Sequence, residues 1–255
     1  MKVGLFLFLA VLCTHMFSYA ELETPIEQQP LKNSEIFLNR TLEYAKRHAT
    51  FKNLVFRNHE REFLSLAKHG QFPKTLFISC SDSRVIPEMI ANSKPGELFV
   101  IRNAGNFVSK HNPDIAWDGV AATIEYAVEV LGVKDIIVCG HSECGAIRGL
   151  FSPQVATDPQ FAILSRWLQF GQEAKETTNE SLQTGATDAE RYTVAEHVSV
   201  LYQLDNLLTY PFIKEKVASG KVFLHGWHFN IKTGEVGYYD PLLDQFLSLS
   251  NLYQK

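Results

Sequence analysis

The spacing of hydrophobic residues changes along the chain, and each change marks a predicted element. Residues 34–51 and 58–70 carry apolar side chains at helical spacing, and His69-Gly70 ends the second of these helices. Further along, short runs rich in β-branched and aromatic residues have the length of strands. The predicted strands are TLFIS (75–79), LFVIRN (98–103), DIIVCGH (135–141) and KVFLHGWHF (221–229).

Helices are predicted between these strands. Residues 118–132 form one, with Asp118 as its N-cap and Gly132 at its end, and residues 194–210 form a longer one. Strands that alternate with helices indicate βαβ units and a parallel sheet covered on both faces. The predicted fold class is therefore α/β: a mostly parallel central sheet flanked by helices, with an N-terminal helical arm. In such sheets, sites form beyond the carboxyl ends of the strands.

The first twenty residues differ from the rest of the chain. Lys2 is followed by an apolar run and then by small residues at Ser18 and Ala20, which is the order of a secretory signal peptide. The apolar run is shorter than the ~20 residues that span a bilayer, so we do not expect a membrane anchor. We predict a signal peptide over 1–20 and an exported protein, periplasmic or secreted, without a membrane segment after cleavage.

The remainder divides in two by its pattern. Residues 21–70 form an N-terminal arm and two helices, whose apolar faces an α/β core need not absorb, so we expect them to take part in dimerisation. Residues 71–255 form the α/β domain. Its composition, 45% hydrophobic and 20% charged over the whole chain, is that of a globular protein. The net charge of −4 gives no reason to expect nucleic acid or an anionic membrane as a partner.

Reactive side chains follow the predicted strand at 75–79. The stretch CSDSRV places Cys80, Asp82 and Arg84 on alternate positions. Alternate side chains of an extended strand share a face, so we expect these three groups to point the same way. A second stretch, CGHSECG, ends another strand and offers His141 and Cys144, which one helical turn would bring to the same side.

The cysteines favour a metal over a disulfide framework. Cys80, Cys139 and Cys144 follow the leader, and an odd number does not suit the disulfide pairs of exported proteins. Cys80, Cys144 and His141 offer two sulfurs and an imidazole, a set that zinc accepts, and catalytic zinc sites keep only three protein ligands. These soft ligands argue against Mg²⁺ or Ca²⁺, while copper and iron stay open on ligand type alone. We expect Cys139 to be a plain buried thiol.

The stretch CSDSRV, followed at this distance by GHSECG, resembles the β-class carbonic anhydrases. The resemblance extends from about Gln71 to the C-terminal HGWHFNIKTGEVGYYDP. It implies that residues 71–255 form a zinc catalytic domain that interconverts carbon dioxide and bicarbonate by attack of zinc-bound hydroxide. It also implies a homodimer or a dimer of dimers, with one Zn²⁺ per chain bound by Cys80, His141 and Cys144.

By the same resemblance, Asp82 and Arg84 form a catalytic dyad beside the metal. An ionised carboxylate only accepts hydrogen bonds, so Asp82 can hold the proton of the hydroxide and turn a lone pair toward CO₂. Arg84 would keep Asp82 ionised and turned away from the metal. In a closed form of the site, Asp82 would instead be a fourth zinc ligand.

The resemblance favours the open form of the site. Forms that close under bicarbonate control carry a Trp and a Tyr at the positions where this chain has Phe77 and Phe229. The Arg that accompanies those two residues in such forms is matched here by Arg102. The open form implies a set of substrate-binding residues: Gln71 as an amide donor, Phe99, Ala104 and Tyr126 as the lining of a small CO₂ pocket, and the Gly145 N–H for a bicarbonate oxygen. Phe99 and Tyr126 lie in apolar runs and could equally be ordinary core residues.

Two other functions stay open. The same fold and metal could hydrolyse CS₂ or COS, which are linear like CO₂. The second alternative is a non-catalytic zinc or thiol protein. Asp82 and Arg84 argue against it, because a structural zinc has a fourth Cys or His in place of an open position. For a zinc enzyme, two thiolates cancel the charge of the metal, so hydroxide should form less readily than at a cationic site. We therefore expect activity to rise on the alkaline side of neutrality.

Overall fold

The computed structural model describes residues 34–115 and 118–253, so the predicted signal peptide lies outside the described residues. The chain divides into two units, Met1–Asn58 and His59–Lys255. The described residues of the first unit form helix α1 (Ser34–Thr50) and the π-helical segment η3 (Phe51–Phe56). No helix in the described part of the chain combines the length and the apolar composition needed to cross a membrane.

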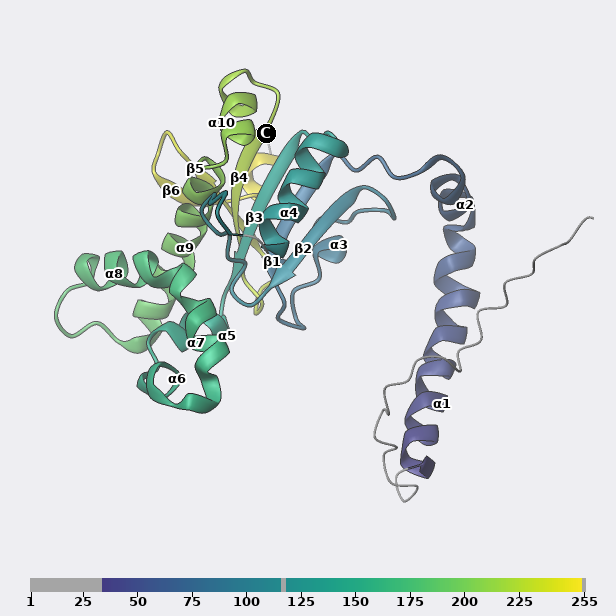
Figure 1. Ribbon diagram of the computed structural model, residues 1–255, viewed down its shortest axis with the longest axis horizontal. Helices are drawn as coiled ribbons and strands as arrows, with labels where there is room; N and C mark the ends of the chain where they lie inside the picture. The colour runs from purple at the N-terminus through teal and green to yellow at the C-terminus, as the bar shows by residue number, and fades with distance from the viewer. Residues whose placement is uncertain (1–33, 116–117, 254–255) are drawn as a thin grey trace, which may run out of the picture. The chain divides into compact units, whose positions relative to one another are not determined.

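The second unit is built on a six-stranded sheet with the order β2-β1-β3-β4-β5-β6 (Figure 1). The first four strands in this order are parallel, and β5 and β6 extend the sheet in antiparallel fashion. The predicted α/β fold with a mostly parallel sheet is thus confirmed. The strands are β1 (Thr75–Cys80), β2 (Leu98–Asn103), β3 (Asp135–His141), β4 (Phe223–Phe229), β5 (Val236–Asp240) and β6 (Gln245–Ser248).

Helices connect the strands and continue beyond them. The first of the unit is α2 (Glu60–His69), which ends where His69-Gly70 predicted. The helices that follow are α3 (Pro87–Ile90), α4 (Gly119–Glu125) with its π-helical continuation η4 (Tyr126–Val130), α5 (Gly145–Leu150), α6 (Pro153–Thr157), η5 (Pro159–Phe161), α7 (Ala162–Leu168), η6 (Gln169–Gly171), α8 (Gln172–Ser181), α9 (Asp188–Leu207), α10 (Pro211–Ala218) and α11 (Ser250–Tyr253).

One face of the sheet carries the larger core. Leu76 and Ile78 are fully buried there because alternate residues of a strand point to the same face. They belong to one apolar cluster with Ile124 of α4, Val200 of α9 and Tyr210, which directly precedes α10. The helices α4, α9 and α10 therefore cover this face. They pack on the strands whose carboxyl ends carry the reactive residues.

The opposite face buries the remaining alternate residues. Phe77 of β1 packs edge-on against Trp227 of β4, with 5.9 Å between the ring centroids, and Phe229 joins the same cluster. Cys139 lies among these aromatic side chains and is fully buried. Burial raises the pKa of its thiol to about 12, and the prediction of a plain buried thiol is confirmed.

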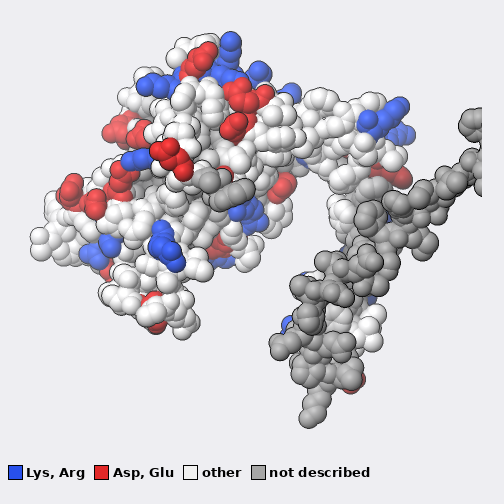
Figure 2. Space-filling model, viewed as in Figure 1, with Lys and Arg blue, Asp and Glu red and all other residues white. Residues whose placement is uncertain are grey.

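Charged side chains of both signs lie on the face of the molecule that Figure 2 shows. On the face shown in Figure 2, acidic and basic residues are interspersed across the described part of the molecule. A site for a long polyanion needs a continuous basic stripe, and the view in Figure 2 does not display one.

Candidate metal centre

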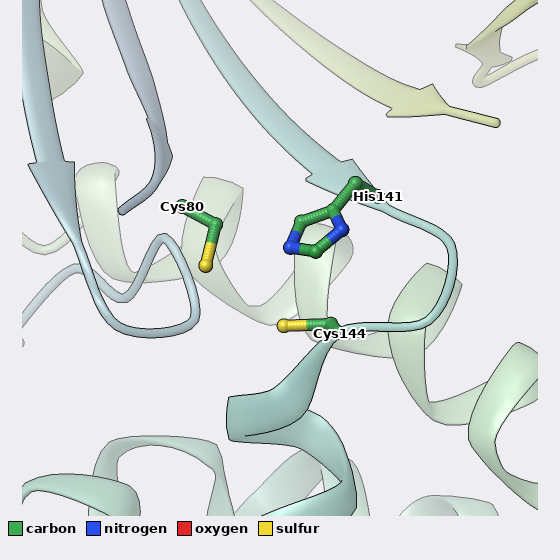
Figure 3. Close-up of side chains that lie close together, drawn as sticks. All are labelled: Cys80, His141 and Cys144. Atoms are coloured by element: carbon green, nitrogen blue, oxygen red, sulfur yellow. The ribbon is translucent and has the colours of Figure 1, made fainter. Parts of the chain in front are cut away.

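Three buried side chains converge at the carboxyl edge of the sheet. Cys80 is the last residue of β1, His141 is the last residue of β3, and Cys144 is the N-cap of α5. Their ligand atoms, two Sγ and one ring nitrogen, all lie within 4.8 Å of one another (Figure 3). The three predicted metal ligands are therefore brought together from two separate stretches of sequence.

Strand register explains why these residues meet. β1 and β3 are neighbours and run parallel, with Ser79 opposite Cys139, so both strands end at one edge. The chain then has to turn back within two residues to bring Cys144 beside His141. Glu143 makes this turn in the left-handed region, with φ of +61°, a conformation that costs energy for any residue with a Cβ atom.

The imidazole of His141 presents a free nitrogen to the two sulfurs. Its Nδ1 lies 2.9 Å from the carbonyl oxygen of Ser142. A carbonyl can only accept, so Nδ1 carries the proton and Nε2 of the neutral ring has an available lone pair. Nε2 is buried and has no hydrogen-bond partner among the described residues. Figure 3 shows one ring nitrogen directed at the space between the sulfur atoms. A metal ion would satisfy this orphaned atom, which is the usual role of such a fixed histidine.

The two thiols are also arranged for a cation. A hydrogen bond from the Cys144 thiol lowers the pKa of Cys80 to about 4 despite its burial, and the N–H of Gly105 adds a further hydrogen bond of 3.4 Å to Cys80 Sγ. The same contact with Cys80 raises the pKa of Cys144. The pair thus readily holds one negative charge, and a divalent cation would allow both sulfurs to become thiolates.

Asp82 and Arg84 form a bidentate ion pair next to this centre. Arg84 donates from Nε to Oδ1 of Asp82 at 2.9 Å and from Nη2 to Oδ2 at 2.7 Å. The side-chain hydrogen bonds from Arg84 hold the pKa of the Asp82 carboxyl far below its usual range. The pair is not a continuation of the strand as predicted. β1 ends at Cys80, and the two residues meet because a turn brings the N–H of Arg84 to Asp82 Oδ1 at 3.0 Å.

Further residues hold the backbone around the centre. Arg102 donates to the carbonyl oxygens of Cys80 at 3.1 Å and Asp82 at 2.7 Å. Arg84 also donates from Nη2 to the carbonyl of Glu143 at 3.1 Å, which links the two reactive stretches. The sequence places Arg102 near the end of a predicted strand, and the resemblance matches it to a regulatory position, but neither indicates its contacts with both carbonyls.

Gly105 and Glu196 were not predicted from the sequence. Gly105 has φ of +90°, and a Cβ atom there would lie 2.7 Å from the ring of Phe107, so only glycine lets its N–H reach Cys80. Glu196 accepts a 3.1 Å hydrogen bond from the backbone N–H of Cys144. The available signal was a single acidic residue inside the apolar pattern VAEHVSVL, and nothing in that pattern indicates a partner 52 residues away.

The predicted substrate-binding residues fall into two groups. Ala104 and Gly145 adjoin the centre, because Ala104 precedes Gly105 and Gly145 follows Cys144 as the first residue of α5. Phe99 belongs to the second group. It pairs with Leu76 in the sheet, four residues before the pair formed by Cys80 and Asn103, so ~13 Å along the strands separates Phe99 from the level of Cys80.

The second group of predicted pocket residues lies away from the centre of its own chain. The ring of Phe99 packs against that of Tyr126, with 5.8 Å between centroids. Gln71 is exposed and lies four residues before β1, beyond the end of the strand opposite to Cys80, and the strand itself is ~17 Å long. The structure therefore does not bring Gln71, Phe99 and Tyr126 to the cysteines and histidine of the same chain.

The fold and this centre define an α/β protein with a buried group of two sulfurs and an imidazole that could hold a metal ion, flanked by an ionised carboxylate. Comparison with known proteins identifies the family. The carbonic anhydrase family model matches residues 75–236, and solved structures similar to this chain include β-class carbonic anhydrases. This chain belongs to the carbonic anhydrase family and to its β class.

Individual relatives support this membership over most of the chain. A carbonic anhydrase of Pseudomonas aeruginosa is 43% identical over 188 residues, which cover 74% of this chain and 82% of the relative. The β-carbonic anhydrase CcaA superposes with a TM-score of 0.77 at 36% identity, covering 82% of this chain and 92% of the other. A tetrameric β-carbonic anhydrase from Sordaria macrospora gives a TM-score of 0.67 at 31% identity, with coverage of 78% and 96%.

Proposed function

We propose that this protein binds one zinc ion through Cys80, His141 and Cys144 and catalyses the reversible hydration of carbon dioxide to bicarbonate and a proton. The observation that carries the proposal is the buried, unpartnered Nε2 of His141 facing two thiols, with an ionised carboxylate alongside. Membership of the β-class carbonic anhydrases supports the same reaction.

Zinc is the metal that this donor set favours. Two thiolates and one imidazole form a borderline-soft set, which suits zinc and leaves a fourth position open in catalytic sites. When bound, zinc supplies Lewis acidity that makes hydroxide available from water near neutral pH. The three ligand atoms already converge within 4.8 Å, so only small side-chain movements are needed to reach ligand distances of ~2.0–2.3 Å from a common centre.

Asp82 and Arg84 would then orient the hydroxide through its proton and its lone pair. Asp82 accepts three hydrogen bonds from Arg84, two at Oδ1 from the backbone N–H and Nε and one at Oδ2 from Nη2, so Oδ2 retains a further lone pair. That lone pair can accept the O–H of a hydroxide held beside it and so turn the oxygen lone pair of the hydroxide toward CO₂. Arg84 keeps Asp82 ionised and directed away from the metal, which favours the open form of the site over direct ligation by Asp82.

The decisive experiment measures turnover and metal on one sample. Purified protein is assayed by stopped-flow CO₂ hydration from pH 6 to 9, and its metal content is determined by elemental analysis. We expect one zinc per chain and a rate that rises toward alkaline pH, and a Cys80→Ser variant should lose both zinc and activity. If the protein holds zinc and does not hydrate CO₂ but releases sulfide from CS₂ or COS, hydrolysis of those substrates would replace the proposed reaction. Zinc with no turnover of any of these substrates would indicate a non-catalytic protein.

We also propose that the protein works as a homodimer or a dimer of dimers. In the first unit, α1 exposes large apolar side chains, including Phe37 at 66% and Tyr44 at 70%, and exposed apolar surface of this kind is typical of interfaces. β2 is an edge strand, so its outer side is open to pairing. The tetrameric relative from Sordaria macrospora is consistent with association.

Residues 1–20 have the order of a secretory signal peptide: a basic residue, an apolar run and then small residues. We propose that this segment is removed and that the mature protein is periplasmic or secreted. Mass spectrometry of the mature chain tests this directly, and an N-terminus at Glu21 is the expected result. Retention of residues 1–20 in the purified protein would rule out cleavage.

A further inference from the structure

A buried carboxylate outside the ligand set contacts one of the ligands. Glu196 lies in the middle of α9 and is only 4% exposed. Its Oε1 accepts the 3.1 Å hydrogen bond from the backbone N–H of Cys144. This carboxylate belongs neither to the three candidate ligands nor to the ion pair of Asp82 and Arg84. A buried carboxylate is costly unless its oxygens are occupied, so its location calls for a function.

The packing of α9 on the sheet places Glu196 at this point. A Cβ atom on Gly140 would lie 2.7 Å from Cγ2 of Val200 and 3.4 Å from the carbonyl oxygen of Glu196. The absence of a side chain at Gly140 therefore lets the backbone of α9 approach β3 closely. Because Gly140 directly precedes His141, the same contact that seats α9 also brings Glu196 to the turn that carries the ligands.

A histidine holds the second oxygen of this carboxylate. His228 on β4 lies opposite Gly140 in the sheet, and its Nε2 is 3.3 Å from Oε2 of Glu196. Both side chains are buried, at 10% exposure for His228 and 3% for Glu196. With its proton on Nε2, His228 donates this hydrogen bond to the carboxylate. Its ring packs in turn against His197, with 4.2 Å between centroids, which limits its rotation.

The turn from His141 to Cys144 is held at each end by a different element. The N–H of Ser142 donates to the carbonyl of Phe229 at 3.0 Å, and the carbonyl of Glu143 accepts from Arg84 at 3.1 Å. The N–H of Cys144 has Glu196 as its partner. Without that acceptor, a buried N–H next to the ligand sulfur would be unsatisfied, and the turn would relax to find another partner.

We propose that Glu196, oriented by His228, is a positioning residue that fixes the backbone of Cys144 so that its Sγ is aimed at the metal. This inference rests on the proposed zinc site. It assigns a role to two residues that do not touch the metal, and it predicts that their loss weakens metal retention. Groups that orient metal ligands in this way typically contribute 10- to 100-fold, as an order of magnitude, to metal affinity.

The test measures zinc release rather than turnover alone. Zinc-loaded wild type and variants are mixed with an excess of a chromophoric chelator, and the release rate is followed by absorbance. Glu196→Ala should release zinc about 10- to 100-fold faster than wild type. Glu196→Gln should stay close to wild type, because its side-chain oxygen can still accept from Cys144. His228→Ala should fall between wild type and Glu196→Ala.

A matched control lies on the same helix. Gln203 is fully buried on α9, and its Oε1 accepts a 2.8 Å hydrogen bond from the backbone N–H of Val108, which is not one of the residues from His141 to Cys144. Gln203→Ala removes an equivalent hydrogen bond and should lower the unfolding temperature while leaving zinc release at the wild-type rate. This comparison separates a positioning role from a general loss of packing.

The outcomes separate this inference from the proposed function. Wild type that binds no zinc contradicts the proposed function itself. Zinc-bound wild type with Glu196→Ala releasing zinc at the wild-type rate, or no faster than Gln203→Ala, overturns the positioning role alone. If Glu196→Ala does not fold, His228→Ala provides the test, and release at the wild-type rate from that variant overturns the role equally. Faster release from the variants, with Glu196→Gln restoring the wild-type rate, supports it.

Discussion

A single backbone contact determines which nitrogen of His141 can bind a metal. The carbonyl of Ser142 accepts from Nδ1 at 2.9 Å, and this leaves Nε2 as the atom that faces Cys80 and Cys144. The carbonyl belongs to the next residue in the chain, so the ring orientation is set locally, before any ion is present. The site is therefore preorganised at its nitrogen ligand, and the entropy of fixing this ring is not lost at the moment of metal binding.

The proposed role of Asp82 leads to a prediction for its amide variant. Asp82→Asn should keep one zinc per chain, because the carboxylate is not one of the three converging ligands. It should lose most CO₂ turnover, about 10²- to 10⁴-fold if the carboxylate acts on the proton of the nucleophile, because an amide can present its N–H₂ in place of an acceptor. Stopped-flow rates normalised to zinc content measure this. Turnover within about twofold of wild type would refute the role of Asp82.

His197 is expected to make stability depend on pH. Burial, with a contribution from the neighbouring His228, lowers the pKa of His197 to about 4, below the ~6.5 of an unfolded histidine. Between these values the unfolded chain binds the proton and the folded protein does not. The contribution of His197 to stability is therefore complete above about pH 6.5 and is lost as the pH falls toward 4.

The variant His197→Gln should lose this dependence. One proton sets an upper limit of ~1.4 kcal/mol per pH unit on the slope that His197 can contribute. Urea unfolding at pH 8, 6.5, 5.5 and 4.5 should show the free energy of unfolding of the variant falling less steeply than that of wild type. Parallel curves would show that His197 binds its proton equally well in the folded and unfolded states.

At the scale of elements, close packing of α9 on β3 requires Gly140. A methyl group there would meet Val200 Cγ2 at 2.7 Å and the carbonyl of Glu196 at 3.4 Å. Gly140→Ala should therefore lower the free energy of unfolding by about 1–3 kcal/mol, the usual cost of overpacking a core. Gly119→Ala is the control, because a Cβ atom on Gly119 meets nothing within 4 Å. Equal unfolding free energies for the two variants, measured in urea, would contradict the close approach of α9.

The elements around the ligands could be predicted because each has a strong local signal. β1, β2 and β3 are apolar runs of strand length, and the structure places them within one residue of the predicted bounds. The N-cap of α4 was also correct. Asp118 accepts from the N–H groups of Val120 and Ala121 at 2.9 and 3.0 Å, which is the hydrogen bonding expected of an aspartate before a helix.

Elsewhere the pattern was too weak to define elements. The predicted helix at 194–210 begins six residues earlier, at Asp188, because Thr187 and Glu190 form a capping box within a polar stretch that has no apolar periodicity. The short helices from α5 to α8 were not predicted, since most are shorter than two turns and show no clear periodicity. Their apolar residues Ile147, Leu150 and Leu168 pack beside Cys80 and Cys144, which only the tertiary structure determines.

The sequence predicted the candidate metal ligands but not the residues that surround them. Cys80, His141 and Cys144 are chemically distinctive and end two adjacent strands, so their convergence followed from the parallel topology. Gly105 and Glu196 contribute a backbone N–H and a buried acceptor from distant segments. Contacts of this kind depend on how α9 and the loop after β2 fold over the centre, and no motif encodes them.

At the scale of the whole molecule, the placement of Gln71 bears on assembly. Gln71 is exposed and lies four residues before the amino end of β1, whereas Cys80 is at the carboxyl end of that strand, which is ~17 Å long. If Gln71 binds substrate, as the resemblance to the family implies, we expect it to do so at the metal centre of a second copy. The proposed dimer would then contain two composite sites, each with metal ligands from one protomer and Gln71 from its partner.

Mixed dimers test this arrangement because the two chains can carry different defects. Cys80→Ser removes the metal from its own chain, and Gln71→Ala removes the amide from whichever site it serves. In a dimer of one chain of each kind, the Gln71→Ala protomer keeps its zinc, and the Cys80→Ser protomer can supply the intact Gln71. One of the two sites is then complete, so co-expressed and doubly tagged mixed dimers should show about half of wild-type kcat per dimer, well above either parent variant. If Gln71 served its own chain, no site in the mixed dimer would be complete, and its CO₂ hydration rate would not exceed the average of the two parents.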